Sequence, residues 1–473
     1  MGTVRPTACS PTSEPPLGVA LNPVVHPIAW CDPFAAFAPH AERPGAALLH
    51  GGDFAILGLR PTQIVTGGFA DLAALLTTRR GVASPGFGPF GGGVIGYFGY
   101  ELGGEIERLP PPAGIGPSLP DMAFAAFDAV AVFDLKARAA AVVAGGLPEH
   151  APDRFAKRAR DRAEALAAEI AAAPALEREK SWGPTRWTAA WTRADYEARI
   201  RRTLDYIRAG DIFQANIAQR FTAPRPEGMR AFALFRRLCR VNPAPFAAFL
   251  CVDGRRAVVS ASPERFLRVT VADGTRRVET RPIKGTRPRG GTRDDDARLA
   301  AELQLSAKDR AENLIIVDLL RNDLSRTAKV GSVQVPSLWG LESFAAVHHL
   351  VSVVTAVPRP EVATLDILRS AFPGGSITGA PKVRAMEIIA ELEGARRGPY
   401  CGAIGWIGDD GAMDTSITIR TLIVEDDTIS VSAGGGIVAD SDPAEEYRET
   451  LVKAAALLRC LVPDPEILRE EGL

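Results

Sequence analysis

The chain has 473 residues, 46% of them hydrophobic and 23% charged, which is enough for a large core and for two or three average domains or one large one. Its formal net charge of −1 gives no indication of a nucleic-acid or anionic-membrane partner. No window holds eighteen uninterrupted apolar residues, so we expect no membrane-spanning helix and a cytoplasmic location.

The first residues, 1–20, are rich in Pro, Ser and Thr and lack the apolar segment of a signal peptide, which predicts a disordered lead-in. The six cysteines are scattered without a C-x-x-C pair, which argues against a zinc site or a disulfide framework and favours reduced thiols. We expect an N-terminal region at 21–180 and a catalytic region at 181–473, joined by the Pro-containing linker 171–184.

The N-terminal region is predicted to be a mainly antiparallel sheet followed by a helix. Apolar segments separated by turns predict strands within 46–59, 94–100, 122–135 and 139–144. The stretch 87–102 is dense in glycine and aromatic residues, but no G-x-G-x-x-G opens a helix there, so phosphate binding is not favoured. An Ala-rich, charged helix is predicted over 153–173.

The catalytic region mixes strands and helices irregularly. A helix over 192–209 has Thr192 as its N-cap, and the strand over 211–221 breaks strict alternation, which predicts a bulge. Further strands are predicted at 246–252, 257–261, 266–271, 400–407, 412–424 and 428–433, and further helices at 294–303, 306–327, 364–372, 379–393 and 443–460. Runs of strands with interspersed helices favour an α+β fold over repeated βαβ units.

Lys284 lies at the centre of T-R-P-I-K-G-T-R-P-R, residues 280–289. Positive charge on Arg281, Arg287 and Arg289, together with partial burial, would favour the neutral, nucleophilic amine of this lysine. The alternative is an exposed basic turn on an ordinary surface.

Three glutamates form a candidate metal site. Glu446 and Glu449 are three residues apart on a predicted helix and therefore share a face, and Glu312 lies on another helix. Carboxylates of this kind suit Mg²⁺, although a solvated helix face is the simpler explanation of Glu446 and Glu449 alone. The Gly-rich segments 373–382 and 433–438 would offer backbone N–H groups to an anion, or form flexible loops.

Long motifs between about 192 and 461 resemble the chorismate-utilising enzymes, which include anthranilate synthase, aminodeoxychorismate synthase component I and the isochorismate and salicylate synthases. The motifs are S-P-E-R-F (262–266), P-I-K-G-T-R-P-R (282–289), K-D-R-A-E-N-L-I-I-V-D-L-L-R-N-D (308–323), H-L-V-S (349–352), G-S-I-T-G-A-P-K (375–382), T-I-R-T (418–421) and G-G-G-I-V-A-D-S-D-P-A-E-E-Y-R-E-T-L-V-K (434–453). The resemblance implies one α+β unit of two large antiparallel β-sheets packed face to face, with helices outside.

The resemblance also implies a set of site residues. Lys284 would attack C2 of the chorismate ring while Glu264 protonates the departing C4 hydroxyl, and ammonia would then enter at C4. The substrate-binding residues would be Gln214, His349, Thr378, Tyr400, Arg420, Gly434, Gly435, Gly436 and Lys453. The Mg²⁺ ligands would be Glu312, Glu446 and Glu449.

Two positions divide the activities within these enzymes. Anthranilate synthases typically carry alanine in place of Lys284, and the isochorismate and salicylate synthases carry lysine in place of Gln214. The pair therefore indicates formation of 4-amino-4-deoxychorismate, the step towards 4-aminobenzoate and folate. Anthranilate formation, or a non-catalytic chorismate-binding homologue, is the alternative.

The sequence lacks two features of related enzymes, and these bear on its partners and its regulation. The sequence lacks a G-x-C-x-G glutaminase elbow, so we expect ammonia from a separate glutamine amidotransferase subunit. The stretch L-L-H-G at 48–51 differs from the L-L-E-S motif that helps anthranilate synthases bind tryptophan, which argues against feedback by tryptophan.

Overall fold

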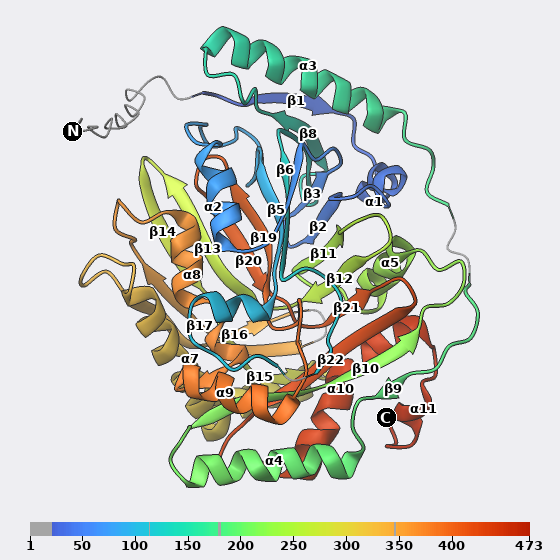
Figure 1. The fold of residues 1–473 in the computed structure, drawn as a ribbon, viewed down its shortest axis with the longest axis vertical. Coiled ribbons are helices and arrows are strands. Elements are labelled where there is room, and N and C mark those ends of the chain that lie inside the picture. Colours follow the sequence, from blue (N-terminus) through green and yellow to red (C-terminus); the bar gives the residue numbers. More distant parts are fainter. Residues whose placement is uncertain (1–20, 113, 178–180, 345–346) are drawn as a thin grey trace, which may run out of the picture.

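The structure, a computed structural model, describes residues 21–112, 114–177, 181–344 and 347–473, and the predicted lead-in lies outside them. Helices surround two large antiparallel sheets, with α3 (Pro152–Ala171) along one end of the molecule and α4 (Arg193–Arg208) at the other (Figure 1). The predicted α+β class and its two large sheets are confirmed.

Within the described residues, the first sheet has twelve strands. These are β1 (Val24–Ile28), β2 (Ala47–Gly51), β3 (Phe54–Gly58), β7 (Ala129–Asp134), β8 (Ala139–Ala144), β9 (Thr188–Ala189), β10 (Gln214–Pro224), β11 (Phe246–Cys251), β12 (Ala257–Ser262), β18 (Gly379–Ala380), β21 (Thr421–Val424) and β22 (Thr428–Ile437). Their order is β1-β8-β7-β3-β2-β11-β12-β21-β22-β10-β18, with β9 also paired to β10.

The second sheet has ten strands in the same part of the chain. These are β4 (Gln63–Thr66), β5 (Gly93–Phe98), β6 (Met122–Phe127), β13 (Arg265–Ala272), β14 (Thr275–Thr280), β15 (Ile283–Pro288), β16 (Gln334–Ser343), β17 (Val347–Ala356), β19 (Ala403–Gly408) and β20 (Met413–Ile417). Their order is β15-β17-β14-β13-β20-β19-β5-β6-β4, and β16 pairs with β17.

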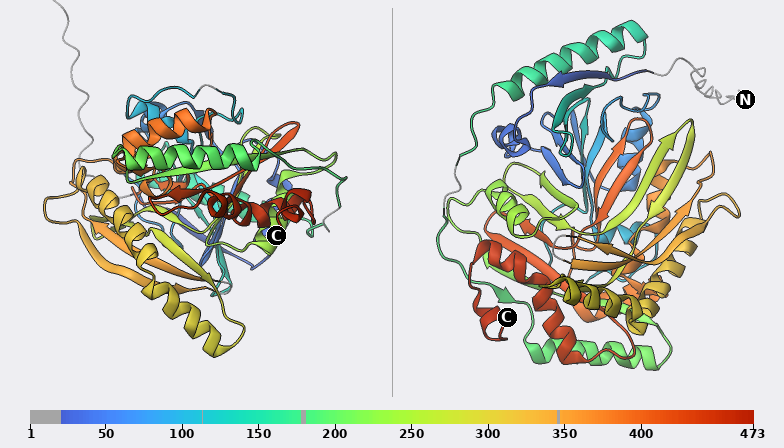
Figure 2. Two further views of the ribbon diagram at one scale, coloured as in Figure 1. Left: turned by 90° about the horizontal axis from the view of Figure 1, so that it is seen from below. Right: turned by 180° about the vertical axis from the view of Figure 1, so that it is seen from behind.

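The remaining helices are α1 (Pro33–Phe37), α2 (Phe69–Thr77), α5 (Ala231–Val241), α6 (Arg293–Leu305), α7 (Ala307–Ser325), α8 (Thr364–Ala371), α9 (Lys382–Glu393), α10 (Pro443–Leu461) and α11 (Glu466–Arg469). Capping side chains fix several starts: Thr192 and Asp195 form a capping box on α4, and Asp442 caps α10 just before Pro443. Helices α4 and α10 pack side by side against β10 and β22 (Figure 1 and Figure 2).

Three apolar clusters define the layers of the molecule. One joins the inner faces of both sheets, with Val132 and Val258 from the first sheet and Ile95 and Trp406 from the second. A second covers the outer face of the first sheet with residues of α1, α3, α4, α5, α9 and α10. A third covers the other sheet with α2, α7 and α8. Face-to-face packing therefore follows from burial of apolar side chains on both faces of each sheet.

Strands from both predicted regions share both sheets. β2 pairs with β11 in the first sheet, and β5 pairs with β19 in the second. The expected boundary near residue 180 therefore does not coincide with a boundary between the sheets.

The chain crosses from one sheet to the other at two short turns that carry predicted site residues. Pro263 and Glu264 join β12 to β13, and residues 418–420 join β20 to β21. At the second crossing Arg420 adopts a left-handed φ of 54°, which breaks the strand direction. The prediction of one continuous strand over 412–424 was therefore wrong.

Other sequence predictions also need correction. The register of β10 with β22 runs unbroken from Ala215 to Pro224, so the predicted bulge is absent from that ladder. Gly379 and Ala380 pair with β10 as β18, and the helix predicted over 379–393 begins only at Lys382. Tyr400 lies in a turn before β19 rather than in the predicted strand. None of the helices in the described ranges is long and apolar enough to cross a membrane.

Candidate active site

Lys284 and Gln214 meet beside a glycine strand. A Cβ atom on Gly436 of β22 would lie 2.5 Å from Gln214 Nε2 and 3.3 Å from Lys284 Nζ, so a larger residue there would displace the ends of both side chains. Gln214 is fully buried, and both polar atoms of its amide lack a hydrogen-bond partner among the described residues. An unsatisfied buried amide is costly, so a ligand that hydrogen-bonds to it would be favoured here.

The arginines around Lys284 do not form the unpaired cationic cluster that the sequence suggested. Each one is paired with a carboxylate: Arg281 with Glu342, Arg287 with Glu302 and Asp309, and Arg289 with Asp296. The charges that face Lys284 are instead the carboxylates of Glu264, Glu312 and Glu449. The three flanking arginines therefore do not act on Lys284 as unpaired like charges, and that part of the sequence prediction was wrong.

Glu264 occupies the crossing between the two sheets. Ser262 Oγ donates to Ile417 O at 2.6 Å, and Ile417 N donates to Glu264 O at 3.0 Å, which fixes the backbone of this turn. Burial raises the pKa of the Glu264 carboxyl, against the opposing effects of the Ser376 hydroxyl and the nearby Lys284 side chain. A carboxyl with a raised pKa retains a proton at higher pH, as a general acid must.

The carboxylates of Glu446 and Glu449 on α10 lie close to the other charged groups of the site. Glu446 is 6% exposed, and burial together with the charge of Glu449 raises its pKa to about 7. Its Oε1 accepts from Ser441 Oγ at 2.7 Å, whereas its Oε2 has no partner in the described part of the chain. A Cβ atom on Gly435 would lie 2.7 Å from that Oε2, so this glycine admits the carboxylate.

Glu449 is half exposed and joins the same group of charges. Burial opposes its ionisation, but Lys453, at 2.5 Å from Glu449 Oε1, and then Lys284 and Lys308 lower its pKa. Burial raises the pKa of Glu312, and Lys284 opposes that rise. The three predicted metal ligands thus share a neighbourhood, although no three His, Cys, Asp or Glu side chains of the described residues are placed, as they lie, to hold a metal ion together.

The predicted anion-binding residues line the same neighbourhood. Arg420 Nη1 donates to Lys453 O at 2.8 Å, and Lys453 Nζ donates to Gly434 O at 2.9 Å. Burial raises the pKa of Tyr400 well above its ordinary value, so the phenol beside Arg420 stays neutral and able to donate a hydrogen bond. The three glycines 434–436 lie within β22, not in the flexible loop considered as an alternative.

His349 and Thr378 each make a side-chain hydrogen bond within the protein. Burial lowers the pKa of His349, and its Nδ1 lies 2.9 Å from Thr286 Oγ1. The Thr378 hydroxyl donates to Gly374 O at 3.0 Å within its own turn, while the Thr378 carbonyl accepts from Asn216 N at 2.8 Å. Thr378 therefore shapes the turn next to Gln214 through bonds inside the protein.

Two residues that lie beside the site were not predicted from the sequence. Ser376, in the Gly-rich segment, hydrogen-bonds to Glu264, and Lys308 lies close to Glu312, Glu446 and Glu449. Lys308 precedes Glu312 by four residues on α7, and that spacing would have indicated a shared helix face. No comparable pattern marked Ser376.

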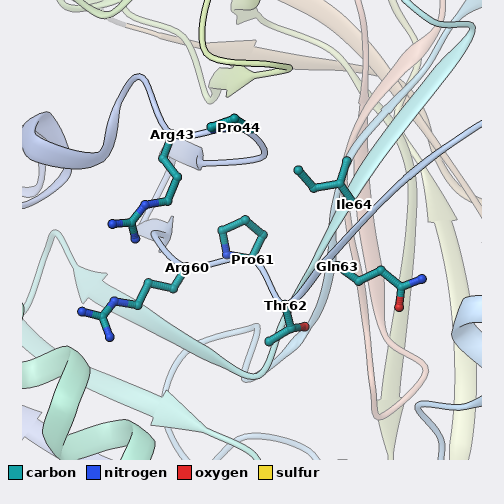
Figure 3. Close-up of a pocket in the computed structure, with 7 residues that line it drawn as sticks. All are labelled: Arg43, Pro44, Arg60, Pro61, Thr62, Gln63 and Ile64. Carbon is teal, nitrogen blue, oxygen red and sulfur yellow. The ribbon is translucent and has the colours of Figure 1, made fainter.

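A cavity of about 540 Å³ elsewhere contains none of these residues. It is lined by Arg43, Pro44, Arg60, Pro61, Thr62, Gln63 and Ile64, and both arginine side chains point away from Gln63 and Ile64 (Figure 3). Arg60 Nε lies 2.5 Å from Glu169 Oε2, which engages that guanidinium. The cavity lacks the acid, amine and carboxylate set found around Lys284.

Curated relatives match most of the chain. It is 42% identical over 472 residues to "Aminodeoxychorismate synthase component 1" of Klebsiella aerogenes, covering 93% of this chain and 99% of that one. It is 44% identical over 414 residues to "Anthranilate synthase component 1" of Streptomyces coelicolor, covering 86% and 80%.

Solved structures share the fold. Anthranilate synthase component I from Streptococcus pneumoniae superposes with a TM-score of 0.76 at 32% identity, over 86% of this chain and 92% of that one. The menaquinone-specific isochorismate synthase MenF from Escherichia coli has a TM-score of 0.72 at 17% identity, over 93% and 94%, which supports the fold alone. The family model described as "chorismate binding enzyme" matches residues 64–459, a span that includes every predicted site residue, and the chain therefore belongs to the chorismate binding enzyme family.

Proposed function

We propose that this chain converts chorismate and ammonia to 4-amino-4-deoxychorismate, as the chorismate-binding component of an aminodeoxychorismate synthase. Relatives named for this activity and for anthranilate synthesis match at similar identity, 42% and 44%, so overall similarity does not separate the two. The observation that carries the proposal is the placement of the Lys284 amine beside Gly436 and Gln214. The resemblance associates alanine at this position with anthranilate synthases.

The amine and the acid have complementary roles in this proposal. Lys284 forms a bond to C2 of the ring, the ring double bond shifts, and the C4 hydroxyl leaves as water with a proton from Glu264. Ammonia then bonds to C4, the double bond shifts back, and the Lys284 nitrogen departs from C2. The proton lost by ammonia restores Glu264. Two displacements through a covalent adduct place the new nitrogen at C4, the carbon that lost oxygen.

Other residues bind the substrate and the metal in this proposal. Arg420, Tyr400 and Lys453 would hold its negative charge through charge-assisted or neutral hydrogen bonds. Glu312, Glu446 and Glu449 would hold Mg²⁺, and the unpartnered, buried Oε2 of Glu446 fits a hard cation. When bound, Mg²⁺ would neutralise the substrate carboxylate and orient the ring.

The source of nitrogen gives the direct test of the proposed function. With chorismate, Mg²⁺ and ammonium salts, the purified chain is expected to form 4-amino-4-deoxychorismate, identified by mass and chromatography. Glutamine is expected to replace ammonium only after a partner amidotransferase is added. Anthranilate as the main product would contradict the proposed activity, and glutamine use by the chain alone would contradict the separate partner.

The metal assignment predicts that Glu449→Gln lowers kcat/KM by at least about 10²-fold, because it removes a ligand charge. Direct calorimetric titration with Mg²⁺ should show weaker binding by the variant than by the wild type. Glu445→Gln on the exposed side of the same helix is the matched control and should retain activity and Mg²⁺ affinity. Wild-type Mg²⁺ affinity in Glu449→Gln would refute the assignment.

A further inference from the structure

Arg397 is a buried cation behind the candidate active site. It is 4% exposed and follows α9, which ends in its ion-pair partner Glu393. Arg397 Nε donates to Glu393 Oε2 at 2.8 Å, and Nη2 donates to Glu393 Oε1 at 2.5 Å. The Glu393 Oε1 atom also accepts from Ala218 N of β10 at 2.9 Å. A buried guanidinium held in this way has a fixed orientation.

The same guanidinium binds two backbone carbonyls next to the site. Its Nη2 donates to Asn216 O at 2.7 Å, and its Nη1 donates to Ile377 O at 3.2 Å. Asn216 lies two residues after Gln214 on β10, and Ile377 lies directly after Ser376. Arg397 therefore ties the strand that presents the unpartnered Gln214 amide to the turn that presents the Ser376 hydroxyl.

Aromatic contacts extend this support to a third part of the site. The Arg397 Cζ atom lies 4.7 Å from the ring centroid of Tyr100 and 5.8 Å from that of Tyr400. Glu101 also accepts from the backbone N–H groups of Arg397 and Gly398, at 2.7 and 2.9 Å, which fixes the segment leading to Tyr400. One buried side chain thus connects the strand of Gln214, the turn of Ser376 and the segment that leads to Tyr400.

We infer that Arg397 is a positioning residue, which sets the Ser376 hydroxyl against Glu264 and the Gln214 amide against the substrate. The inference rests on the proposed function for the identity of the reaction. A planar guanidinium can reach Glu393 and two carbonyls at once, and a lysine ammonium cannot reproduce that set of directions. Loss of the two carbonyl bonds would let the turn and the strand shift relative to each other.

The test is Arg397→Lys in the full chain, assayed with chorismate, Mg²⁺ and ammonium. The lysine keeps the positive charge beside Glu393, so folding should be retained. We expect kcat to fall by about 10²-fold, the loss that misplacement by about 1 Å produces, with a chorismate KM within about threefold of wild type. Arg396→Lys, at the neighbouring half-exposed position, is the matched control and should leave kcat unchanged.

A second variant separates positioning from stability. Glu393→Gln weakens the buried ion pair but leaves Arg397 able to donate to the two carbonyls, so it should lower Tm more than Arg397→Lys and kcat less. A wild-type kcat in Arg397→Lys, or a kcat loss that follows Tm across both variants, would overturn the inference. If the wild type consumes chorismate but yields another product, the proposed function fails, and chorismate consumption by the variants still decides the role of Arg397.

Discussion

Lys284→Ala is expected to lower formation of 4-amino-4-deoxychorismate by at least about 10³-fold, because the covalent path through C2 requires the amine. Chorismate binding should persist, since Arg420, Tyr400 and Lys453 lie on other segments of the chain. Some ammonia would then add at C2, giving an anthranilate-type product in place of the normal one. Product identification by mass spectrometry measures both effects in one experiment.

The wild type offers an independent check of the same step. Incubated with chorismate and Mg²⁺ without ammonia, it should form an adduct on the peptide that contains Lys284. Lys329→Ala, at an exposed turn, is the control and should retain the wild-type rate. If no adduct is trapped and Lys284→Ala makes 4-amino-4-deoxychorismate at the wild-type rate, the covalent mechanism is wrong.

Glu264→Gln is expected to lower kcat by about 10²- to 10⁴-fold, the usual contribution of a general acid, because the amide cannot supply a proton to the leaving hydroxyl. The side chain stays close in size, so chorismate affinity should change little. Glu279→Gln replaces a carboxylate on β14 that pairs with Arg265 outside the site, and it should remain active.

The pH profile adds a signature specific to Glu264. Burial raises the pKa of this carboxyl above its ordinary value of 4.5, with Lys284 and Lys453 opposing the rise. The acid form is present below the raised pKa, so the Glu264 contribution to kcat should be lost as pH rises through it. In Glu264→Gln that decline should disappear, and an unchanged decline would assign it to another group.

The fold class was predicted correctly from the sequence, because the resemblance rests on long contiguous motifs. The helix from Pro443 was predicted within a residue of its end, since Asp442, Pro443 and the apolar periodicity are local signals. The placement of Glu446, Glu449 and Lys453 on one helix follows from the prediction of that helix alone. Local signals of this kind do not depend on the rest of the fold.

Features that depend on distant pairing were not predictable in the same way. The arginines flanking Lys284 looked like unpaired charge because no side-chain pattern revealed their partners: Glu342 lies on a strand 61 residues from Arg281, and Asp296 lies on the helix that follows Arg289. The break at Arg420 lies within an apolar run, where nothing local marks a change of sheet. The role inferred for Arg397 depends on carbonyls of Asn216 and Ile377, which no side-chain pattern reveals.

The shared sheets have a consequence for synthesis of the chain on the ribosome. β5 is complete once residue 98 has been made, but its partner β19 begins only at Ala403. In the same way, β2 is made well before its partner β11. At about 5–20 residues per second, β5 can pair early with β6 but lacks β19 on its other edge for tens of seconds after it emerges. The nascent chain must carry apolar strands with open edges through that interval, so the fold cannot close until translation is nearly finished.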